Sequence, residues 1–350
     1  MTGPSRLRIA LVLGTPGTVP GGMEKHTSDL AAGLARLGHE VHVLAHRSFA
    51  SILPATVHLH EIPMSASRNN PWLIYRVRRT LASIAPDICH AQGNKAAKLI
   101  ARYRKPGVPR IGTVHGIKSS HRSFAALDGV ITINQRMQDS LRHRQTRLIY
   151  SGVPTLAIPP KSKLSPLTAL PTSQPLILAI GRLEPVKAFD LLIRAWACVD
   201  TPGHLVIIGD GSQRSVLQAL IRDLDQTDRV TLAGFRNDAR DWLAYADLCV
   251  ISSVREGFSY VLIEALLAGC PILSTPVGGA QEFLPADNLT NGHSVDAMSR
   301  LLRQHLTDLA SLKQGQSSAR ARAQQELTLD AMLAQTQQFY RALIHNAQGV

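Results

Sequence analysis

The sequence predicts an α/β protein built from two doubly wound parallel-sheet domains that face a cleft. The chain has 350 residues, more than one hydrophobic core usually supports. Two series of short apolar runs alternate with helix-periodic segments, a pattern typical of parallel sheets with crossover helices. A proline-rich stretch without periodicity separates the two series, so we expect domains at 1–155 and 175–325 and a linker at 156–174.

The first domain begins with a strand, a glycine-rich loop and a helix. An apolar run at 9–13 precedes residues 14–22, which are rich in Gly, Pro and Thr, and Leu30, Leu34 and Leu37 then recur at helical spacing. Further strands are expected at 41–44, 87–91, 111–114 and 130–133. Further helices are expected at 72–85 and 94–104.

The second domain repeats the alternation. Its strands are expected at 176–180, 205–208, 230–233, 248–251 and 272–273. Its helices are expected at 189–199, 214–224, 238–246 and 260–268. The chain is helical in pattern from about Ser294, and we expect its last segment, 326–350, to form a helix that packs back toward the first domain.

Charge is divided unevenly between the two halves. Residues 1–155 hold 21 Lys and Arg against 7 Asp and Glu, and the remainder holds 17 against 18, so the net charge of +13 comes from the first half. Such a field suggests an acidic partner: anionic lipid, a phosphorylated acceptor or nucleic acid. The basic residues singled out for a membrane or acceptor contact are Arg76, Arg79, Lys95, Lys98 and Arg102. A solvated helix face is the competing explanation.

Composition favours a cytoplasmic protein. Apolar runs stay well short of the roughly 20 residues that span a bilayer, and the first residues lead directly into a strand pattern. Four cysteines lie far apart without CxxC spacing, and we expect buried free thiols: Cys89, Cys198, Cys249 and Cys270.

Two acids flank a loop between a predicted strand and a predicted helix. Glu256 stands beside Gly257 after the strand at 248–251, and Glu264 lies about two turns into the following helix. Loops at the carboxyl ends of parallel strands are where such sheets bind ligands, and carboxylates accept hydrogen bonds from sugar hydroxyls. A solvated loop acid and a satisfied buried acid are the alternative explanation for either residue alone.

Other strand ends carry cations, glycines and aromatic residues. Arg182 and Lys187 follow the strand at 176–180, where they could hold a pyrophosphate. The remaining candidates at strand ends and at the start of the first helix are Gly22, His115, Gly209, Phe235 and Arg236. Gly22 could meet a phosphate at a helix start, Phe235 and Arg236 could lie against a base, and a structural turn is the competing role for Gly209 and His115.

Together these motifs resemble a family 4 retaining glycosyltransferase of GT-B fold, in the family's order and over residues 8–285 or so. The segments that carry the resemblance are 21–26, 114–116, 181–187, 209–211, 234–235 and 256–265. The chain is also similar in this respect to bacterial enzymes of lipopolysaccharide-core and surface-glycan synthesis.

The resemblance implies a role for each candidate. Arg182 and Lys187 would hold the donor diphosphate, Glu264 the ribose and Glu256 the transferred sugar, with His115 beside that sugar. The remaining donor contacts implied by the resemblance are Gly22, Gly209, Phe235, Arg236, Gly257, Phe258 and Ser259.

The resemblance also implies that no metal or other cofactor is needed, because cations and a helix dipole neutralise the leaving diphosphate. Asp223 and Asp225 match a DxD motif in letters but fall in a helix pattern, so we do not assign them to a metal. Ala188 departs from the family, which usually has glycine there, and the loop is expected to curl less freely.

We therefore expect a retaining hexosyltransferase that uses a nucleotide diphosphate sugar, with a UDP-sugar favoured, and a glycan or glycolipid acceptor in lipopolysaccharide or surface polysaccharide synthesis. Its basic half would rest on the anionic inner face of the cell membrane. One alternative is another GT-B enzyme such as a nucleotide-sugar epimerase. Another is a non-catalytic protein that binds nucleotide sugar or nucleic acid, but the chain shows no recognisable nucleic-acid module.

Overall fold

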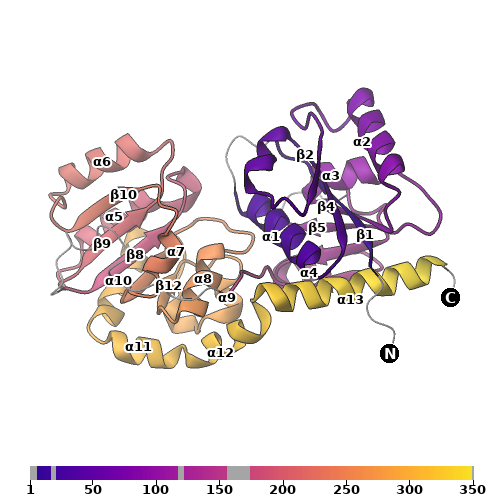
Figure 1. The fold of residues 1–350 in the computed structure, drawn as a ribbon. Coiled ribbons are helices and arrows are strands. Elements are labelled where there is room, and N and C mark those ends of the chain that lie inside the picture. Colours follow the sequence, from indigo (N-terminus) through magenta and orange to yellow (C-terminus); the bar gives the residue numbers. More distant parts are fainter. Residues whose placement is uncertain (1–5, 17–20, 117–121, 156–173, 349–350) are drawn as a thin grey trace. The chain divides into compact units, whose positions relative to one another are not determined.

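The structure is a computed structural model that describes residues 6–16, 21–116, 122–155 and 174–348 (Figure 1). It divides into two compact units, and the chain enters the first of them twice. Unit 1 comprises Met1–Pro154 and Glu326–Val350, and unit 2 comprises Thr155–Gln325. The predicted linker at 156–174 lies almost entirely outside the described residues.

Unit 1 contains a seven-stranded parallel sheet in the order β3-β2-β1-β4-β5-β6-β7. Its strands are β1 (Arg8–Leu13), β2 (Glu40–Ala45), β3 (His58–Glu61), β4 (Ile88–Gln92), β5 (Arg110–Val114), β6 (Gly129–Thr132) and β7 (Thr146–Leu148). Its helices are α1 (Gly22–Arg36), α2 (Pro71–Ile84), α3 (Gly93–Ile100), α4 (Gln135–Ser140), α13 (Leu329–Gln348) and the 3-10 helix η1 (Arg47–Ile52). The doubly wound fold class is confirmed for this unit.

One predicted helix of unit 1 is wrong at its carboxyl end. The expected helix at 94–104 stops at Ile100 in α3, because Pro106 and Gly107, with a φ of +75°, turn the chain soon after it. Arg102 therefore lies beyond the helix, and Lys95, Lys98 and Arg102, which recur at helical spacing in the sequence, do not lie on one continuous helix face.

The last helix, α13, completes the core of unit 1. It runs beside α1 and buries one apolar face there (yellow in Figure 1). The buried side chains that it contributes are Leu329, Met332, Leu333, Phe339, Tyr340 and Leu343. Glycines allow close approach beneath it: a Cβ on Gly33 would lie 2.5 Å from a Leu333 methyl carbon, and one on Gly129 would lie 2.8 Å from Leu343.

The two chain segments that connect the units run side by side in unit 1. The Val153 amide donates to the Leu327 carbonyl at 3.1 Å, and the Leu329 amide donates back to the Val153 carbonyl at 2.9 Å. A Cβ at Gly152 would stand 2.2 Å from the Thr328 carbonyl oxygen, so a side chain cannot be accommodated at that position without movement.

Unit 2 contains a five-stranded parallel sheet in the order β10-β9-β8-β11-β12. Its strands are β8 (Leu176–Ile180), β9 (His204–Ile208), β10 (Val230–Gly234), β11 (Leu248–Ile251) and β12 (Ile272–Ser274). Its helices are α5 (Phe189–Ala197), α6 (Arg214–Asp223), α7 (Ala239–Trp242), α8 (Tyr260–Ala268), α9 (Ala280–Phe283), α10 (Val295–Leu306), α11 (Leu309–Gly315) and α12 (Ser317–Glu326), with short 3-10 helices η4 (Pro185–Lys187) and η5 (Ala286–Asn288).

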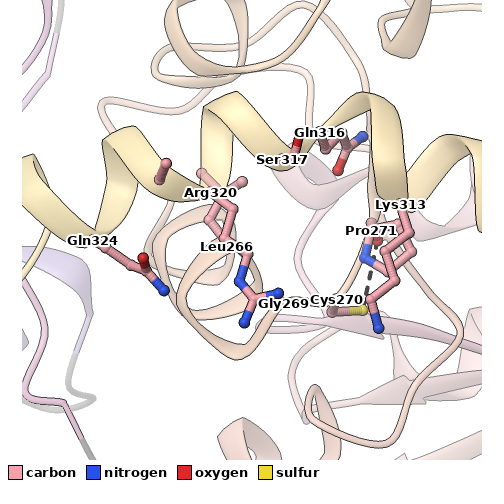
Figure 2. A pocket seen from close by; sticks show the side chains of 10 residues that line it. Leu266, Gly269, Cys270, Pro271, Lys313, Gln316, Ser317, Arg320 and Gln324 are labelled. Atoms are coloured by element: carbon pink, nitrogen blue, oxygen red, sulfur yellow. Dashed lines mark hydrogen bonds between the residues drawn. The ribbon is translucent and has the colours of Figure 1, made fainter.

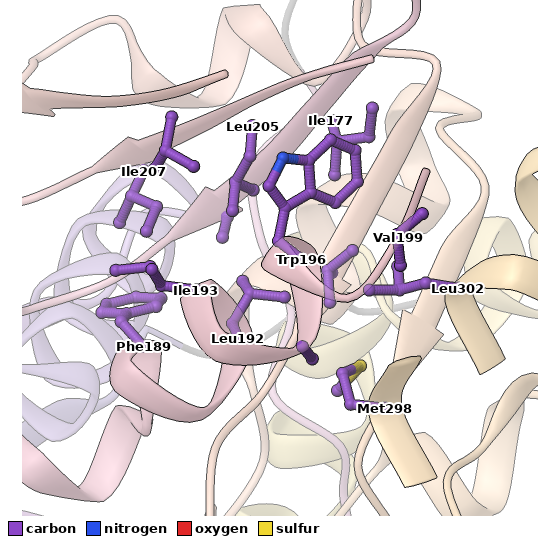
Figure 3. Packing of buried hydrophobic residues seen from close by; sticks show 14 of the residues in the cluster. Ile177, Phe189, Leu192, Ile193, Trp196, Val199, Leu205, Ile207, Met298 and Leu302 are labelled. Carbon is purple, nitrogen blue, oxygen red and sulfur yellow. The ribbon is translucent and has the colours of Figure 1, made fainter. Parts of the chain in front are cut away.

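Trp196 forms the centre of the unit 2 core. It is fully buried and packs with Leu205 and Ile177 of the sheet, with α10 closing the far side through Met298 and Leu302 (Figure 3). Burial of a side chain this large contributes a few kcal/mol to the stability of the unit.

Each sheet has a point where the strand order reverses. In unit 1 the chain passes from β1 outward to β2 and β3 and returns on the other side at β4, and in unit 2 it does the same between β8 and β11. Loops at such reversals diverge and leave space above the carboxyl ends of the strands, where α/β sheets bind ligands. Among the described residues, no helix is both long and apolar enough to span a bilayer.

Candidate active site

Lys187 and Glu256 meet at the reversal point of the unit 2 sheet. Lys187 ends η4 in the loop after β8, and Glu256 lies in the loop after β11, which pairs with β8. Lys187 Nζ lies 2.5 Å from Glu256 Oε1, and the Ser253 hydroxyl donates to the same oxygen at 2.8 Å. Two residues that the sequence suggested for separate roles thus form one ion pair.

The two loops are also joined through their backbones. The Val254 amide donates to the Val186 carbonyl at 2.9 Å, and the Ser252 hydroxyl donates to the Lys187 carbonyl at 2.8 Å. These bonds hold Lys187 against Glu256, so the charged pair is positioned by the sheet rather than by flexible side chains alone.

Ala188 adopts a left-handed conformation, with φ 48° and ψ 45°. The loop therefore adopts the left-handed turn despite its alanine. The left-handed conformation costs a non-glycine residue about 1–2 kcal/mol, and the surrounding structure offsets that cost.

Gly209 and Arg182 belong to neighbouring turns at this sheet edge. A Cβ on Gly209 would lie 1.8 Å from the Gly181 carbonyl oxygen, and the Gly181 amide donates to the Ile208 carbonyl at 2.9 Å. Close packing of two turns is therefore sufficient to explain glycine at 209, whatever it binds. Arg182 stands exposed on the adjoining turn.

Phe235 and Arg236 differ in their freedom to move. The Phe235 ring is 74% exposed, which suits a platform for a flat ligand. Arg236 is held by Asp238 through two hydrogen bonds of 2.7 and 2.8 Å and stacks 4.9 Å from the centre of the Trp242 ring. Asp238 and Trp242, which sequence reasoning missed, thus orient Arg236.

The start of α8 carries the remaining donor candidates. Ser259 is the residue before the helix and is buried, whereas Gly257 and Glu264 are half-buried. The Phe258 ring is buried against Phe283, with ring centres 5.9 Å apart. The first amide groups of α8 have no partner within the helix and favour an anion there.

A pocket of about 370 Å³ lies elsewhere in unit 2 (Figure 2). It is bounded by the end of α8 and by α11 and α12, and the side chains that line it include Cys270, Lys313, Gln316 and Arg320. Cys270 and Pro271 precede β12, so the pocket opens at the amino edge of the sheet. None of the predicted site residues lines it.

In unit 1, the half-buried His115 follows β5 and lies beside two buried histidines, His26 and His90. Its ring lies 4.7 Å from the His26 ring, edge to face, and its Nε2 lies 2.6 Å from Gln92 Oε1. Burial lowers the pKa of His115 well below the usual range, with smaller contributions from His26 and His90. Burial likewise lowers the pKa of His26 to about 4 and that of His90 to about 3. All three rings are therefore neutral at pH 7.

Sequence reasoning missed the partners of His115. His90 and Gln92 lie on β4 two positions apart, so they point to the same side of the sheet. Two polar residues in an otherwise apolar strand were the available signal. Gly22, the other candidate in this unit, opens α1, with Gly21 donating its amide to the Glu24 carboxylate at 3.0 Å.

The basic residues of unit 1 separate into two groups. Arg76 and Arg79 are exposed on α2 beside Trp72 and Tyr75, which are 54% and 56% exposed. Arg76 stacks over the Trp72 ring at 5.4 Å.

The second group lies on and after α3. Lys95 and Lys98 are half-buried, and the Lys95 ammonium donates to the Met64 carbonyl. Arg102 is exposed beyond the helix and donates to the Lys98 carbonyl at 3.0 Å. These three residues therefore do not form one open helix face.

Three of the cysteines are buried as expected, but Cys198 is exposed, because it follows the last residue of α5 on the outer side of that helix. All four are free thiols. Burial raises the pKa of the Cys89 and Cys270 thiols to about 12, so these thiols remain protonated and unreactive.

Two family models match consecutive parts of the chain. The model described as Glycosyltransferase Family 4 matches residues 20–155, and that described as Glycosyl transferases group 1 matches residues 174–308. The chain is 30% identical over 206 residues to the lipopolysaccharide core biosynthesis glycosyltransferase LpsE of Rhizobium meliloti strain 1021. That alignment covers 57% of this chain and 58% of the relative's length.

Solved structures share the fold over nearly the whole chain. A glycosyltransferase from Rickettsia africae ESF-5 superimposes with a TM-score of 0.83 at 19% identity, covering 98% of this chain and 100% of the other. Anabaena Alr3699/HepE in complex with UDP-glucose gives a TM-score of 0.78 at 24% identity, covering 95% and 99%. At these identities the similarity establishes the two-domain fold.

Proposed function

The chain belongs to the glycosyltransferases, and on this premise we propose that it transfers a hexose from a nucleotide diphosphate sugar to a glycan or glycolipid acceptor. A UDP-sugar is the favoured donor, because the Anabaena neighbour of the same fold binds UDP-glucose. The similarity to a lipopolysaccharide core enzyme supports an acceptor in lipopolysaccharide or surface polysaccharide synthesis.

The observation that carries this proposal is the ion pair of Lys187 and Glu256 at the reversal point of the unit 2 sheet. It supports the proposal because a cation suited to a diphosphate lies beside a carboxylate suited to sugar hydroxyls. Arg182 stands exposed on the preceding turn, and the amino end of α8 adds a positive dipole. Glu264, half-buried on α8, is the group we assign to the ribose hydroxyls.

In the proposed reaction, the diphosphate takes Lys187 and Arg182 as its cations, and sugar hydroxyls donate to Glu256 in place of the Lys187 ammonium. Charge that develops on the departing phosphate is stabilised by groups already in position, which lowers the barrier. The bond between the anomeric carbon and the phosphate oxygen breaks as the acceptor oxygen bonds to the same face. Because the acceptor bonds on the face that the phosphate leaves, configuration is retained. The acceptor proton passes to the leaving phosphate, whose charge Lys187 and Arg182 neutralise in place of a metal.

Donor binding tests the assignment in unit 2. Titration calorimetry with UDP should show about tenfold weaker binding for Glu264→Gln, the size of one charge-assisted hydrogen bond. Lys313→Met in the same unit serves as a control and should leave the affinity unchanged. Equal affinity for wild-type and Glu264→Gln proteins would remove the ribose role.

Product analysis tests the reaction class. Anomeric NMR of the product should show the configuration of the donor, and transfer should persist in EDTA. Interconversion of free donor without transfer would support an epimerase instead, and a metal requirement would contradict the mechanism.

We also propose that the outer face of α2 docks on an anionic membrane. Trp72, Tyr75, Arg76 and Arg79 recur at helical spacing on the side opposite the buried Leu73 and Val77. Aromatic rings that sit at the headgroup level beside guanidinium groups are typical of interfacial helices. The proposed membrane-binding surface is therefore one face of α2 and not the whole basic half of the chain.

Co-sedimentation with phosphatidylglycerol vesicles tests this surface. The double charge reversal Arg76→Glu with Arg79→Glu should abolish binding, whereas Arg222→Glu on α6 of unit 2 should not, although Arg222 is also exposed. Retention of binding by the α2 double variant would refute the proposal.

A further inference from the structure

A chain of buried polar side chains runs through unit 1 from α13 to the end of β5. Tyr340 Oη lies 2.6 Å from His90 Nδ1, and His90 Nε2 lies 2.7 Å from the Thr113 hydroxyl. Gln92 connects this group to His115, since its Nε2 lies 3.3 Å from His90 Nε2 and its Oε1 lies 2.6 Å from His115 Nε2.

The groups from Tyr340 to Gln92 are shielded from water, whereas His115 at the end of the chain is half-buried. Tyr340 and Thr113 are fully buried, and His90 and Gln92 are 1% exposed. Register places Gln92 directly beside Thr113 on neighbouring strands. Buried polar groups without partners are costly, so each group here must donate or accept in a compatible direction.

Together with the orientation of the Gln92 amide in the structure, that requirement indicates which nitrogen of His115 carries the proton. The Gln92 carbonyl oxygen can only accept, so the neutral His115 ring must donate to it from Nε2. The Gln92 amide group then donates toward His90 Nε2, which also accepts from Thr113, and His90 donates from Nδ1 to Tyr340. In this arrangement His115 Nδ1 carries only a lone pair.

We propose that Gln92 is a positioning residue that holds His115 in the Nε2–H tautomer, so that Nδ1 accepts a hydrogen bond from a hydroxyl group of the sugar substrate. The hydroxyl contact rests on the proposed function. The tautomer does not, because it is a property of the protein without ligand. His115 would thus recognise a hydroxyl and would not supply a proton to the leaving group.

The charge state of His115 supports this role. Among the residues that the structure describes, the titratable groups that act on His115 are His26 and His90, and burial keeps the pKa of both well below the usual range. The hydrogen bond made by one imidazole nitrogen sets the protonation of the other. A neutral His115 that donates from Nε2 can only accept at Nδ1, so it selects a ligand group that donates a hydrogen bond.

Nitrogen-15 NMR of histidine-labelled full-length protein at pH 7.5 tests the tautomer, with His115→Phe identifying the signal. We expect a single Nε2-protonated form in the wild-type protein. Gln92→Met, similar in length but without an acceptor, should give a mixture of tautomers. Gln138→Met should leave the signal unchanged, since Gln138 accepts from Thr132 outside this chain of groups. An Nδ1-protonated His115 in the wild type, or an unchanged signal in Gln92→Met, would overturn the proposal.

Kinetics test the hydroxyl contact separately. In Gln92→Met, kcat/KM should fall about tenfold, the effect of one hydrogen bond, while UDP affinity stays the same because UDP binds through unit 2. Gln92→Glu keeps the acceptor but favours the imidazolium form, so its activity should recover only at higher pH. It also serves if Gln92→Met does not fold.

The two arms distinguish the possible failures. A changed tautomer together with wild-type kcat/KM in Gln92→Met would refute the substrate contact. A wild-type protein that has the expected tautomer but transfers no sugar would refute the proposed function instead.

Discussion

The ion pair of Lys187 and Glu256 should contribute measurably to the stability of unit 2 as well as to activity. The two side chains are 19% and 14% exposed, so the pair lies between the surface and the interior. Exposed ion pairs contribute about 0.2–1 kcal/mol, and removal of one partner from a fully buried pair costs about 3–5 kcal/mol. For Lys187→Met we expect a loss of about 2 kcal/mol in the free energy of unfolding.

The reciprocal change should cost less. Glu256→Gln keeps the hydrogen bond from the Ser253 hydroxyl, and the flexible Lys187 side chain can turn toward water, so we expect a loss of about 1 kcal/mol. The double variant should also lose about 2 kcal/mol, because the second change no longer breaks a pair. The resulting coupling energy is about 1 kcal/mol.

Urea unfolding followed by tryptophan fluorescence measures these differences. Of the three tryptophans, only Trp72 lies in unit 1, so a Trp72→Phe background leaves Trp196 and Trp242 to report on unit 2 alone. Additive losses in the double variant, with coupling below about 0.3 kcal/mol, would show that the pair does not form in solution and would refute the reasoning.

Three further predictions concern the backbone, acid stability and the last helix. Gly209→Ala places a Cβ 1.8 Å from a backbone oxygen and should lower the free energy of unfolding in urea by at least about 3 kcal/mol. Gly315→Ala, which has open space around its Cβ, should not lower it. Equal midpoints of urea unfolding for the two variants would contradict the packing argument. Buried His26 has a pKa lowered to about 4, so the unfolded chain binds its proton first on acidification, and His26 should contribute about 1.6 kcal/mol of the stability lost from pH 6.5 to pH 5; the loss should be smaller by about that amount in His26→Gln, and equal losses in the two proteins would contradict this. A chain that ends at Gln325 should lose the unfolding transition of unit 1 but keep that of unit 2, and one that ends at His345 should keep both, as circular dichroism during thermal unfolding would show.

Most of the fold was predictable because buried parallel strands and amphipathic helices leave strong periodic signals. The strand at 248–251 and the helix at 260–268 occur at the predicted residues, as β11 and α8. Two strands were missed for physical reasons. His58–Glu61 is an edge strand with polar, half-exposed side chains, and Thr146–Leu148 has only three residues.

The candidate site was only partly accessible from sequence. Strand ends located Lys187 and Glu256 separately, but their pairing depends on β8 and β11 being neighbours, a property of topology. The environment of His115 was less accessible still. Tyr340 lies 250 residues beyond the His90 that it contacts, and no local pattern reports on such a partner. The ligand roles assigned from the resemblance remain predictions.

The return of the chain to unit 1 has a consequence for biosynthesis. Unit 2 is complete once Gln325 has left the ribosome, whereas unit 1 still lacks the helix that covers its α1 side. The second half of the sequence can therefore fold before the first is finished, the reverse of the usual order for successive domains. Until α13 emerges, the nascent first unit exposes the apolar side chains that this helix covers, and chaperone binding to stalled chains should concentrate there.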